Sequence, residues 1–188
     1  MPKLGAEPIR KAALINAVID QVGQAGSLDV TVAQIARAAG MSPALAHHYF
    51  GSKDQIFLAA MRHVLKVFGD SVRRGLPGRD PRGRLDTIIA ASFGPQNFRH
   101  EVVSAWLNFY AMALVNDEAA RLLRVYHLRL RSNLVHALRP LTDRPEAVAD
   151  TMGALIDGVY LRAALAPGPT DSMAAIRMLT SHLNKELT

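Results

Sequence analysis

Aliphatic side chains recur every three or four residues along nearly the whole chain, and stretches in which apolar and polar residues alternate are absent. Glycine and proline fall between the periodic stretches, where they end one helix before the next begins. The pattern therefore predicts an all-α protein of about nine helices. The long helices are expected over residues 7–24, 53–74, 83–93, 98–115, 117–139, 145–166 and 171–187.

Two much shorter helices are expected between the first two long ones. Residues 31–34, Thr-Val-Ala-Gln, have the form of a capping box, in which the threonine hydroxyl and the glutamine side chain each accept a hydrogen bond from the other residue's backbone. The helix that begins at Val32 ends at Gly40, because glycine readily adopts the left-handed conformation. Ser42 and Pro43 then suit the start of a second short helix. Two short helices joined by a tight turn are typical of a helix-turn-helix unit.

The second short helix has one face available to DNA. Leu45 is expected to point inward. The residues expected on the other side, where they can meet base edges in a major groove, are Pro43, Ala44, His47 and His48. A further capping box at residues 52–55 starts the following long helix, whose free amides together with Lys53 offer a phosphate site.

The distribution of charge agrees with this interpretation. The net charge is +6, and residues 1–84 contain 12 Lys and Arg against 6 Asp and Glu, whereas residues 85–188 contain 10 of each kind. Positive charge on a protein favours the binding of polyanions such as DNA, because the phosphates are neutralised and their counterions are released. A merely solvating surface would carry the same charge, so the motif remains the stronger indication. We expect a DNA-binding domain at residues 1–52 and a helical regulatory and dimerisation domain at residues 53–188.

Several classes of protein lack support in the sequence. Cysteine is absent, which excludes disulfides and thiolate metal sites, and no apolar run reaches the roughly 18 residues of a membrane span. We expect a soluble cytoplasmic protein without a membrane partner, associated with the nucleoid when it is bound to DNA. The seven histidines form no His-Glu-x-x-His motif, and no nucleophile elbow or phosphate-binding glycine loop occurs. No catalytic residue, metal or cofactor is therefore expected. An enzyme remains an alternative, since serines and histidines distant in sequence can meet in space.

The run from Thr31 to Lys53 resembles the N-terminal signature of TetR-family repressors. Its threonine, Ile-Ala pair, glycine, inward leucine, Tyr-Phe pair and closing lysine all fall in register. The resemblance implies that Thr31, Tyr49 and Lys53 hold backbone phosphates. It places nearest the groove the residues Ser42, Pro43, Ala44, His47 and His48. This reading face has no Arg, Asn or Gln to grip a base, so specificity is expected to rest on the histidines, thymine methyl contacts and DNA shape.

Three other segments resemble the BetI group of this family. They are residues 1–5 (Met-Pro-Lys-Leu-Gly), residues 105–109 (Ala-Trp-Leu, then Phe109) and residues 154–165, from Ala-Leu-Ile-Asp to Ala-Ala-Leu. Members of that group repress genes for choline uptake and for its oxidation to glycine betaine, and choline relieves the repression. The resemblance implies the same function for this chain, with choline as the effector.

A cation of this kind requires a particular site. A quaternary ammonium has no hydrogen to donate, so it is bound by aromatic faces, and a nearby carboxylate adds attraction. We hypothesise one cage lined by Trp106, Phe109, Tyr110, Asp157 and Tyr160. Aromatic residues at helical spacing are also typical of a core, and Asp157 can instead pair with Arg162 or with a neighbouring arginine. The sequence leaves both interpretations open.

The last two helices suit an interface between two chains. The helix expected over residues 145–166 is apolar around more than one face, so it must be buried on two sides. TetR-family dimers pair their last two long helices, and a twofold pair of reading helices recognises an inverted repeat in double-stranded DNA. We therefore expect a homodimer. The main alternative keeps the DNA-binding unit but changes the ligand, as in a TetR-type regulator of an efflux or catabolic operon.

Overall fold

The computed structural model describes residues 6–187, and within that range the chain folds into nine helices without a strand. This confirms the all-α prediction. The segment 1–5 that resembles the BetI group lies outside the described residues. The helices are α1 (Ala6–Ala25), α2 (Val32–Ala38), α3 (Pro43–Phe50), α4 (Lys53–Gly75), α5 (Pro81–Ser92), α6 (His100–Ala113), α7 (Asp117–Leu138), α8 (Pro145–Leu165) and α9 (Ser172–Glu186).

Two helices differ in their bounds from the sequence prediction, and local hydrogen bonds explain where each of them begins. The helix expected from Gly83 begins at Pro81, because the Asp80 side chain caps it by accepting from the amide of Gly83 at 2.7 Å. The helix expected over 98–115 is shorter at both ends. Before it, the amides of Asn97 and Phe98 donate to the Gly94 carbonyl and form a separate turn.

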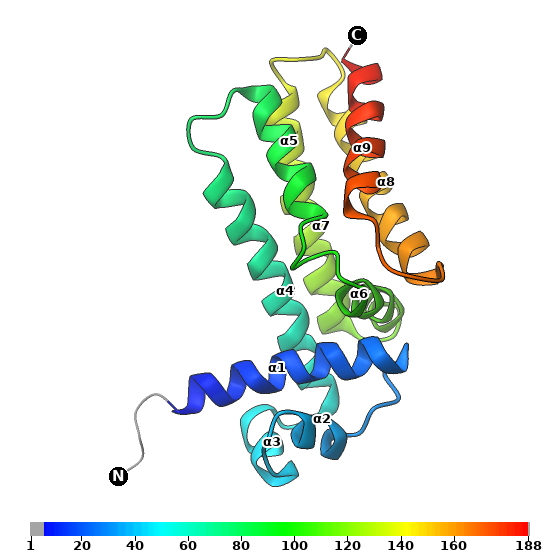
Figure 1. Ribbon diagram of the computed structural model, residues 1–188. Coiled ribbons are helices and arrows are strands. Elements are labelled where there is room, and N and C mark those ends of the chain that lie inside the picture. Colours follow the sequence, from blue (N-terminus) through cyan, green and yellow to red (C-terminus); the bar gives the residue numbers. More distant parts are fainter. Residues whose placement is uncertain (1–5, 188) are drawn as a thin grey trace.

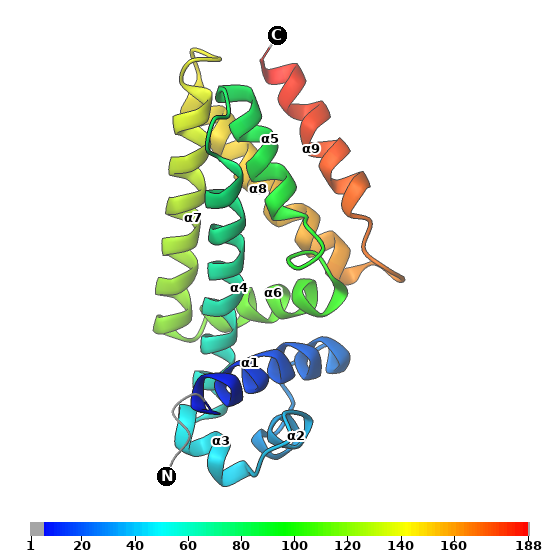
Figure 2. The same cartoon turned by 60° about the vertical axis from the view of Figure 1, so that its left-hand side comes forward.

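The molecule is elongated, with a small head at one end of a bundle of long helices (Figure 1). The head consists of α1, α2 and α3, and α4 leads from it into the body. The body contains α5 to α9, and α6 crosses the bundle next to α1 (Figure 2). Any signal that passes from the body to the head therefore has two direct routes, along α4 and across the contact of α6 with α1.

The contact between α1 and α6 is unusually close. A Cβ atom at Gly23 would lie 2.5 Å from the Cα atom of Glu101, which is closer than real Cβ atoms approach a backbone. An ion pair crosses the same junction, where the Arg99 guanidinium lies 2.8 Å from Asp20 and 3.0 Å from Glu101. A hydrogen bond from the backbone of Glu101 holds the pKa of its own carboxyl group below the usual range. The positive charge of Arg99 lowers that pKa further.

Replacing Gly23 with alanine should force the two helices apart. We expect a loss of about 1–3 kcal/mol in the free energy of unfolding, since overpacking of a tight contact costs that much. Urea denaturation followed by circular dichroism measures it. Gln24→Ala, on the exposed side of the same helix, is the control and should change the free energy by less than about 0.5 kcal/mol. An equally stable Gly23→Ala protein would contradict the close packing.

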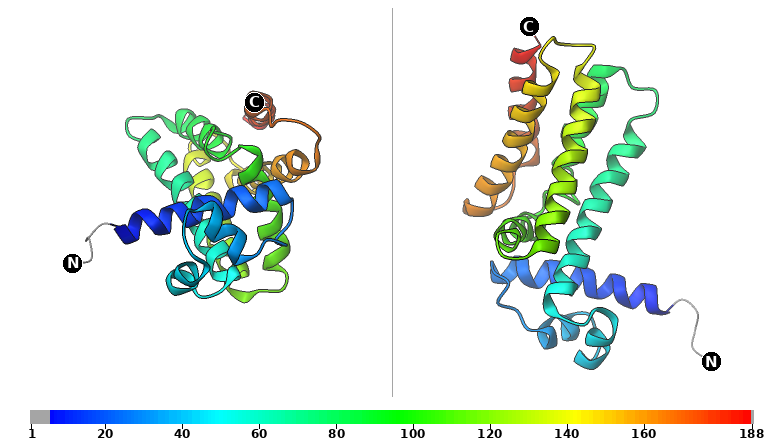
Figure 3. Two further views of the ribbon diagram at one scale, coloured as in Figure 1. Left: turned by 60° about the horizontal axis from the view of Figure 1, so that its bottom comes forward. Right: turned by 180° about the vertical axis from the view of Figure 1, so that it is seen from behind.

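The helices α8 and α9 lie together along one side of the body (Figure 3). Their inner faces contribute to the core through residues such as Met152, Ile156 and Leu179. Their outer faces keep large apolar side chains exposed, namely Leu161, Leu165, Met173 and Met178. The prediction that α8 is buried on two sides is thus fulfilled on only one side within a single chain.

In the part of the chain that the structure describes, none of the helices combines the length and apolar character of a membrane span.

Candidate DNA-binding face and ligand site

The first part of the helix-turn-helix unit forms as the capping signals predict. The Thr31 hydroxyl accepts from the amide of Gln34 at 3.2 Å, and the Gln34 side chain accepts from the amide of Thr31 at 2.7 Å. After α2, Gly40 has a φ of 70°, and the amide of Met41 donates back to the Ala36 carbonyl at 2.9 Å. The left-handed glycine lets the chain turn within three residues and start α3 at once.

The reading helix α3 begins at Pro43, and the Ser42 hydroxyl caps it by accepting from the amide of Leu45. The five residues predicted to lie nearest the groove are all exposed: Ser42, Pro43, Ala44, His47 and His48. The inward side differs from the prediction, because Ala46 is fully buried and Leu45 only half-buried. A small residue at the buried position lets α3 pack closely on its neighbours.

The ring of His47 has a defined orientation. Its Nδ1 atom lies 2.5 Å from the carbonyl oxygen of Gly51, so Nδ1 carries a proton and donates it. In the neutral ring the other nitrogen, Nε2, is then an acceptor. His47 can therefore accept a hydrogen bond from an exposed amino group of a base.

The three residues predicted to hold phosphates lie at the edge of this face. Thr31 is exposed, and Tyr49 and Lys53 are half-buried. The Lys53 ammonium donates to the carbonyl of Leu28 at 2.8 Å, which leaves two of its three protons for other acceptors. Lys11 lies beside Tyr49, with its Nζ atom 5.6 Å from the ring centroid. Lys11 was not predicted to lie at this face, because only the fold brings α1 next to the end of α3.

The predicted capping box at the start of α4 forms only in part. The Ser52 hydroxyl accepts from the amide of Gln55 at 3.2 Å, as expected. The Gln55 side chain does not return to Ser52. It donates instead to Glu118 on α7 at 2.9 Å, and Arg62 forms an ion pair with the same carboxylate. The reason is tertiary: the N-terminus of α7 lies beside α4 and presents a charged acceptor.

The residues of the hypothesised cage come together around Trp106 on α6, the helix of the body that packs on α1. The centroid of its ring system lies 5.6 Å from Tyr110, 5.7 Å from Phe109 and 5.8 Å from Tyr160. Tyr126 on α7 is closer still, at 4.9 Å, and the sequence analysis did not select it. The sequence does not indicate that Tyr126 joins the cluster, because the cage residues that it does indicate lie on α6 and α8 and not on α7.

Asp157 is bound to this cluster through Tyr110, whose hydroxyl donates to the carboxylate at 2.9 Å. Its second neighbour is His127, with Nε2 3.1 Å from the other carboxylate oxygen. The alternative pairing with Arg162 is therefore wrong, since α7 and not the next turn of α8 faces the carboxylate. A histidine offers a positive charge only when it is protonated, so Asp157 retains attraction for another cation.

The three tyrosines around Asp157 remain neutral phenols. Burial, and then the Asp157 carboxylate, raise the pKa of Tyr110 well above its usual value, and the same two causes raise the pKa of Tyr126 and of Tyr160. The Tyr160 hydroxyl donates to the carbonyls of Ser92 and Asn97, which holds its ring in place. Aromatic faces beside one carboxylate are the chemistry that a quaternary ammonium requires.

The aromatic cluster is closed in this structure. Trp106 is 4 % exposed, and Tyr126 and Tyr160 are 8 % and 6 % exposed. Tyr110 and His127, the two partners of Asp157, also line a hollow of about 500 Å³ between α6 and α7. Arg124 and Arg131 line the same hollow and Asp157 does not, so a cation can reach the carboxylate and enter the cluster only if the rings separate.

Within residues 6–187, no group of three or more His, Cys, Asp or Glu side chains is arranged so that it could hold a metal ion.

Comparison with known proteins extends over the whole chain. Residues 14–60 match the family described as bacterial regulatory proteins of the tetR family, and residues 81–188 match the BetI-type transcriptional repressor C-terminal family. The HTH-type transcriptional regulator BetI of Brucella melitensis is 48% identical over 191 residues, which cover 100% of this chain and 96% of that protein.

Solved structures share the fold at lower identity. A TetR transcription regulator from Haloarcula marismortui has a TM-score of 0.82 at 21% identity, covering 95% of this chain and 98% of that one. A regulator from Saccharomonospora viridis, solved in complex with choline, has a TM-score of 0.80 at 20% identity, covering 93% of this chain and 95% of that one.

Proposed function

The chain belongs to the TetR family of transcriptional regulators and to its BetI-type group, and from this premise we propose that it represses genes for choline transport and glycine betaine biosynthesis until choline binds. That it is a DNA-binding transcriptional repressor and not an enzyme follows from the family itself. The observation that carries the choline assignment is the Asp157 carboxylate among aromatic rings in the BetI-type region.

At the head of the molecule, α3 enters the major groove of the operator. Its exposed small residues, Pro43 and Ala44, permit close approach and contact with thymine methyl groups, while His47 accepts from a base amino group through Nε2. Thr31, Tyr49 and Lys53 hold the flanking phosphates, with Ser42 and His48 near the groove. Because these contacts are few, DNA shape contributes to the choice of operator.

Two copies of the chain bind an inverted repeat. One short reading helix offers few base contacts, and a twofold pair doubles them. The exposed apolar side chains of α8 and α9 supply a face for pairing as a four-helix interface. An exposed apolar patch of this kind is typical of an interaction surface.

Choline binds against Asp157, with its methyl groups on the faces of Trp106, Tyr110 and Tyr160, while Phe109 supports Trp106 from behind. Entry of the cation separates rings that now touch, and therefore displaces α6. Because α6 packs on α1 with no space at Gly23, that displacement reaches the head. Choline then favours a dimer whose reading helices no longer match the operator.

The test is a fluorescence anisotropy titration of the purified protein on DNA from upstream of its own gene, with and without millimolar choline. We expect choline to weaken binding. The matched control is 3,3-dimethylbutanol, which has the shape of choline without its charge and should have no effect. Specific binding that choline leaves unchanged would favour the regulator with a different ligand, and absence of specific binding would contradict the repressor.

Replacing Lys53 with alanine should weaken binding to all DNA sequences about equally. Loss of one phosphate contact reduces the slope of log K against log salt by about 1. Titrations at several salt concentrations measure this slope. Lys66→Ala, a mostly exposed lysine farther along α4, is the control and should leave the slope unchanged. An unchanged slope in Lys53→Ala would mean that Lys53 contacts no phosphate and that its role is limited to the hydrogen bond with Leu28.

A further inference from the structure

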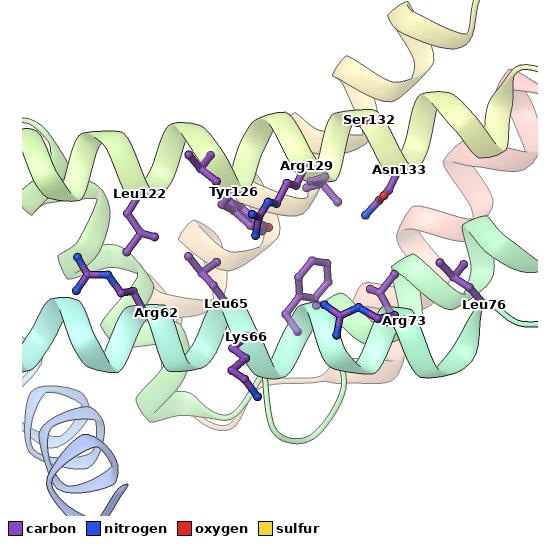
Figure 4. A pocket seen from close by; sticks show the side chains of 15 residues that line it. Arg62, Leu65, Lys66, Arg73, Leu76, Leu122, Tyr126, Arg129, Ser132 and Asn133 are labelled. Carbon is purple, nitrogen blue, oxygen red and sulfur yellow. The ribbon is translucent and has the colours of Figure 1, made fainter. Parts of the chain in front are cut away.

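A groove of about 620 Å³ separates α4 from α7 on the face of the body that Figure 4 shows. Its apolar residues from α4 are Leu65, Phe68, Val72 and Leu76, and those from α7 include Leu122, Tyr126 and Leu130. Leu65, Phe68 and Val72 recur on one face of α4, and Leu76 directly follows that helix. The eleven steps from Leu65 to Leu76 make an apolar stripe about 16 Å long at 1.5 Å per residue. Such a stripe suits a narrow, extended apolar molecule.

The charged residues that line the groove are all basic. They are Arg62, Lys66, Arg73 and Arg129, and none of the described residues that line it is acidic. Asp70 pairs with Lys66 and Arg73, and Glu118 pairs with Arg62, but neither carboxylate lines the groove. Two carboxylates therefore offset four cations, so the groove keeps an excess of positive charge.

Arg129 is the cation that is best placed for a ligand. Figure 4 shows it extending from α7 toward α4, and it forms no ion pair with any carboxylate among residues 6–187. Ser132 and Asn133 follow it by three and four positions, so the three polar groups share one side of α7. A guanidinium with free donors binds a carboxylate through two parallel hydrogen bonds.

We propose that this groove binds an amphipathic anion, a carboxylate with an unbranched alkyl tail. The tail lies on the apolar stripe of α4, and the carboxylate lies against Arg129, with Asn133 beside it. A cation such as choline is excluded here by the charge of the lining, so the groove is a second site beside the aromatic cluster.

Gly69 leaves space for the tail. It lies on the groove wall in the middle of α4, and a Cβ atom there would meet only the Nη2 atom of Arg73, at 3.9 Å. A glycine within a helix is unfavourable compared with alanine, and here it adds room in the groove. A larger side chain at this position fills the groove without straining the helix.

The groove adjoins both the aromatic cluster and the helix that leads from the head. Tyr126 contacts Phe68 in the groove, with ring centroids 6.0 Å apart, and it contacts Trp106 in the aromatic cluster. The other wall is α4, which begins directly after the reading unit. An occupant of the groove therefore affects the cation site and the head, although its binding does not rest on the function proposed above.

The test is isothermal titration calorimetry of the full chain with decanoate, kept below the concentration at which it forms micelles. We expect decanoate to bind, acetate not to bind because it lacks the tail, and 1-decanol to bind at least about tenfold more weakly because it has the tail without the charge. Arg129→Glu should weaken decanoate binding at least about tenfold, and Gly69→Leu should abolish it while the melting temperature stays equal or rises.

Arg124→Glu is the matched control, since Arg124 lies on α7 but lines the other hollow. It should leave decanoate binding unchanged. Loss of binding in Arg124→Glu with full binding in Arg129→Glu would place the anion in that other hollow and overturn the proposal. Equal affinity for decanoate and 1-decanol, or no binding of decanoate, would overturn it as well. Neither DNA nor choline enters this measurement, so its failure is distinct from a failure of the repressor function.

Discussion

Replacing Asp157 with asparagine should abolish the response to choline and leave operator binding intact. Asparagine keeps the size of the side chain and can still accept from the Tyr110 hydroxyl, but it carries no charge. A cation about 4 Å from a carboxylate gains on the order of 4 kcal/mol at an effective dielectric constant of 20. Allowing for solvent screening, we expect choline affinity to fall about a hundredfold. Calorimetry with choline and anisotropy with operator DNA measure the two functions separately.

Asp150→Asn provides the control for this experiment. Asp150 lies on the same helix, two turns earlier, and pairs with Arg131 of α7 on the surface. Its replacement removes the same charge outside the aromatic cluster, so choline should act as on the unaltered protein. A normal choline response in Asp157→Asn would contradict the proposal that choline binds in the aromatic cluster. Trp106→Ala is a poorer test, because truncation of a buried aromatic residue costs about 3–5 kcal/mol and can unfold the body.

Replacing Ala44 with glutamate should abolish operator binding without affecting choline. Ala44 is exposed near the start of α3, where the proposed contact with DNA leaves little space. A glutamate there brings a longer side chain and a negative charge against the phosphates. The loss of one close contact together with the repulsion should weaken binding more than about a hundredfold, as for two unfavourable changes of about 1–3 kcal/mol each.

Ala90→Glu introduces the same charge on the exposed side of α5, in the body, and should bind the operator normally. Calorimetry with choline shows whether Ala44→Glu still folds and binds its effector. Retained operator affinity in Ala44→Glu would mean that α3 does not read the groove. Together, Asp157→Asn and Ala44→Glu separate the two proposed functions, since each should remove one and spare the other.

The head was largely predictable because its signals are local. Thr31 and Gln34 exchange hydrogen bonds over three residues, and the amide of Leu45 donates to the Ser42 hydroxyl over the same spacing. The helix geometry itself brings those groups together. Two details differ. Ala46 and not Leu45 is the fully buried residue of α3, and a charged residue from α7 competes for the Gln55 side chain that local geometry alone would return to Ser52.

The body was predictable only in part. The sequence selected Trp106, Tyr110 and Asp157 as members of one cluster, and the structure places them in contact, although it does not test their role. Tyr126 was not selected, because periodicity shows which residues share a helix face and not which face meets another helix. The sequence left Asp157 open between the cage and a pair with an arginine, and in the structure its neighbours are Tyr110 and His127, the latter thirty positions away.

By itself, then, the sequence determined the approximate extents of the nine helices, the caps at Thr31 and Ser42, the turn at Gly40 and the exposed face of α3, because hydrogen bonds over three or four residues and the spacing of apolar side chains decide these features. Only the tertiary structure decided which helices face each other. The closeness of α1 and α6 at Gly23, the pairing of Asp157 with His127 and the basic groove between α4 and α7 depend on the crossing and separation of packed helices. Those quantities result from the packing of all side chains together, and no short stretch of sequence contains them.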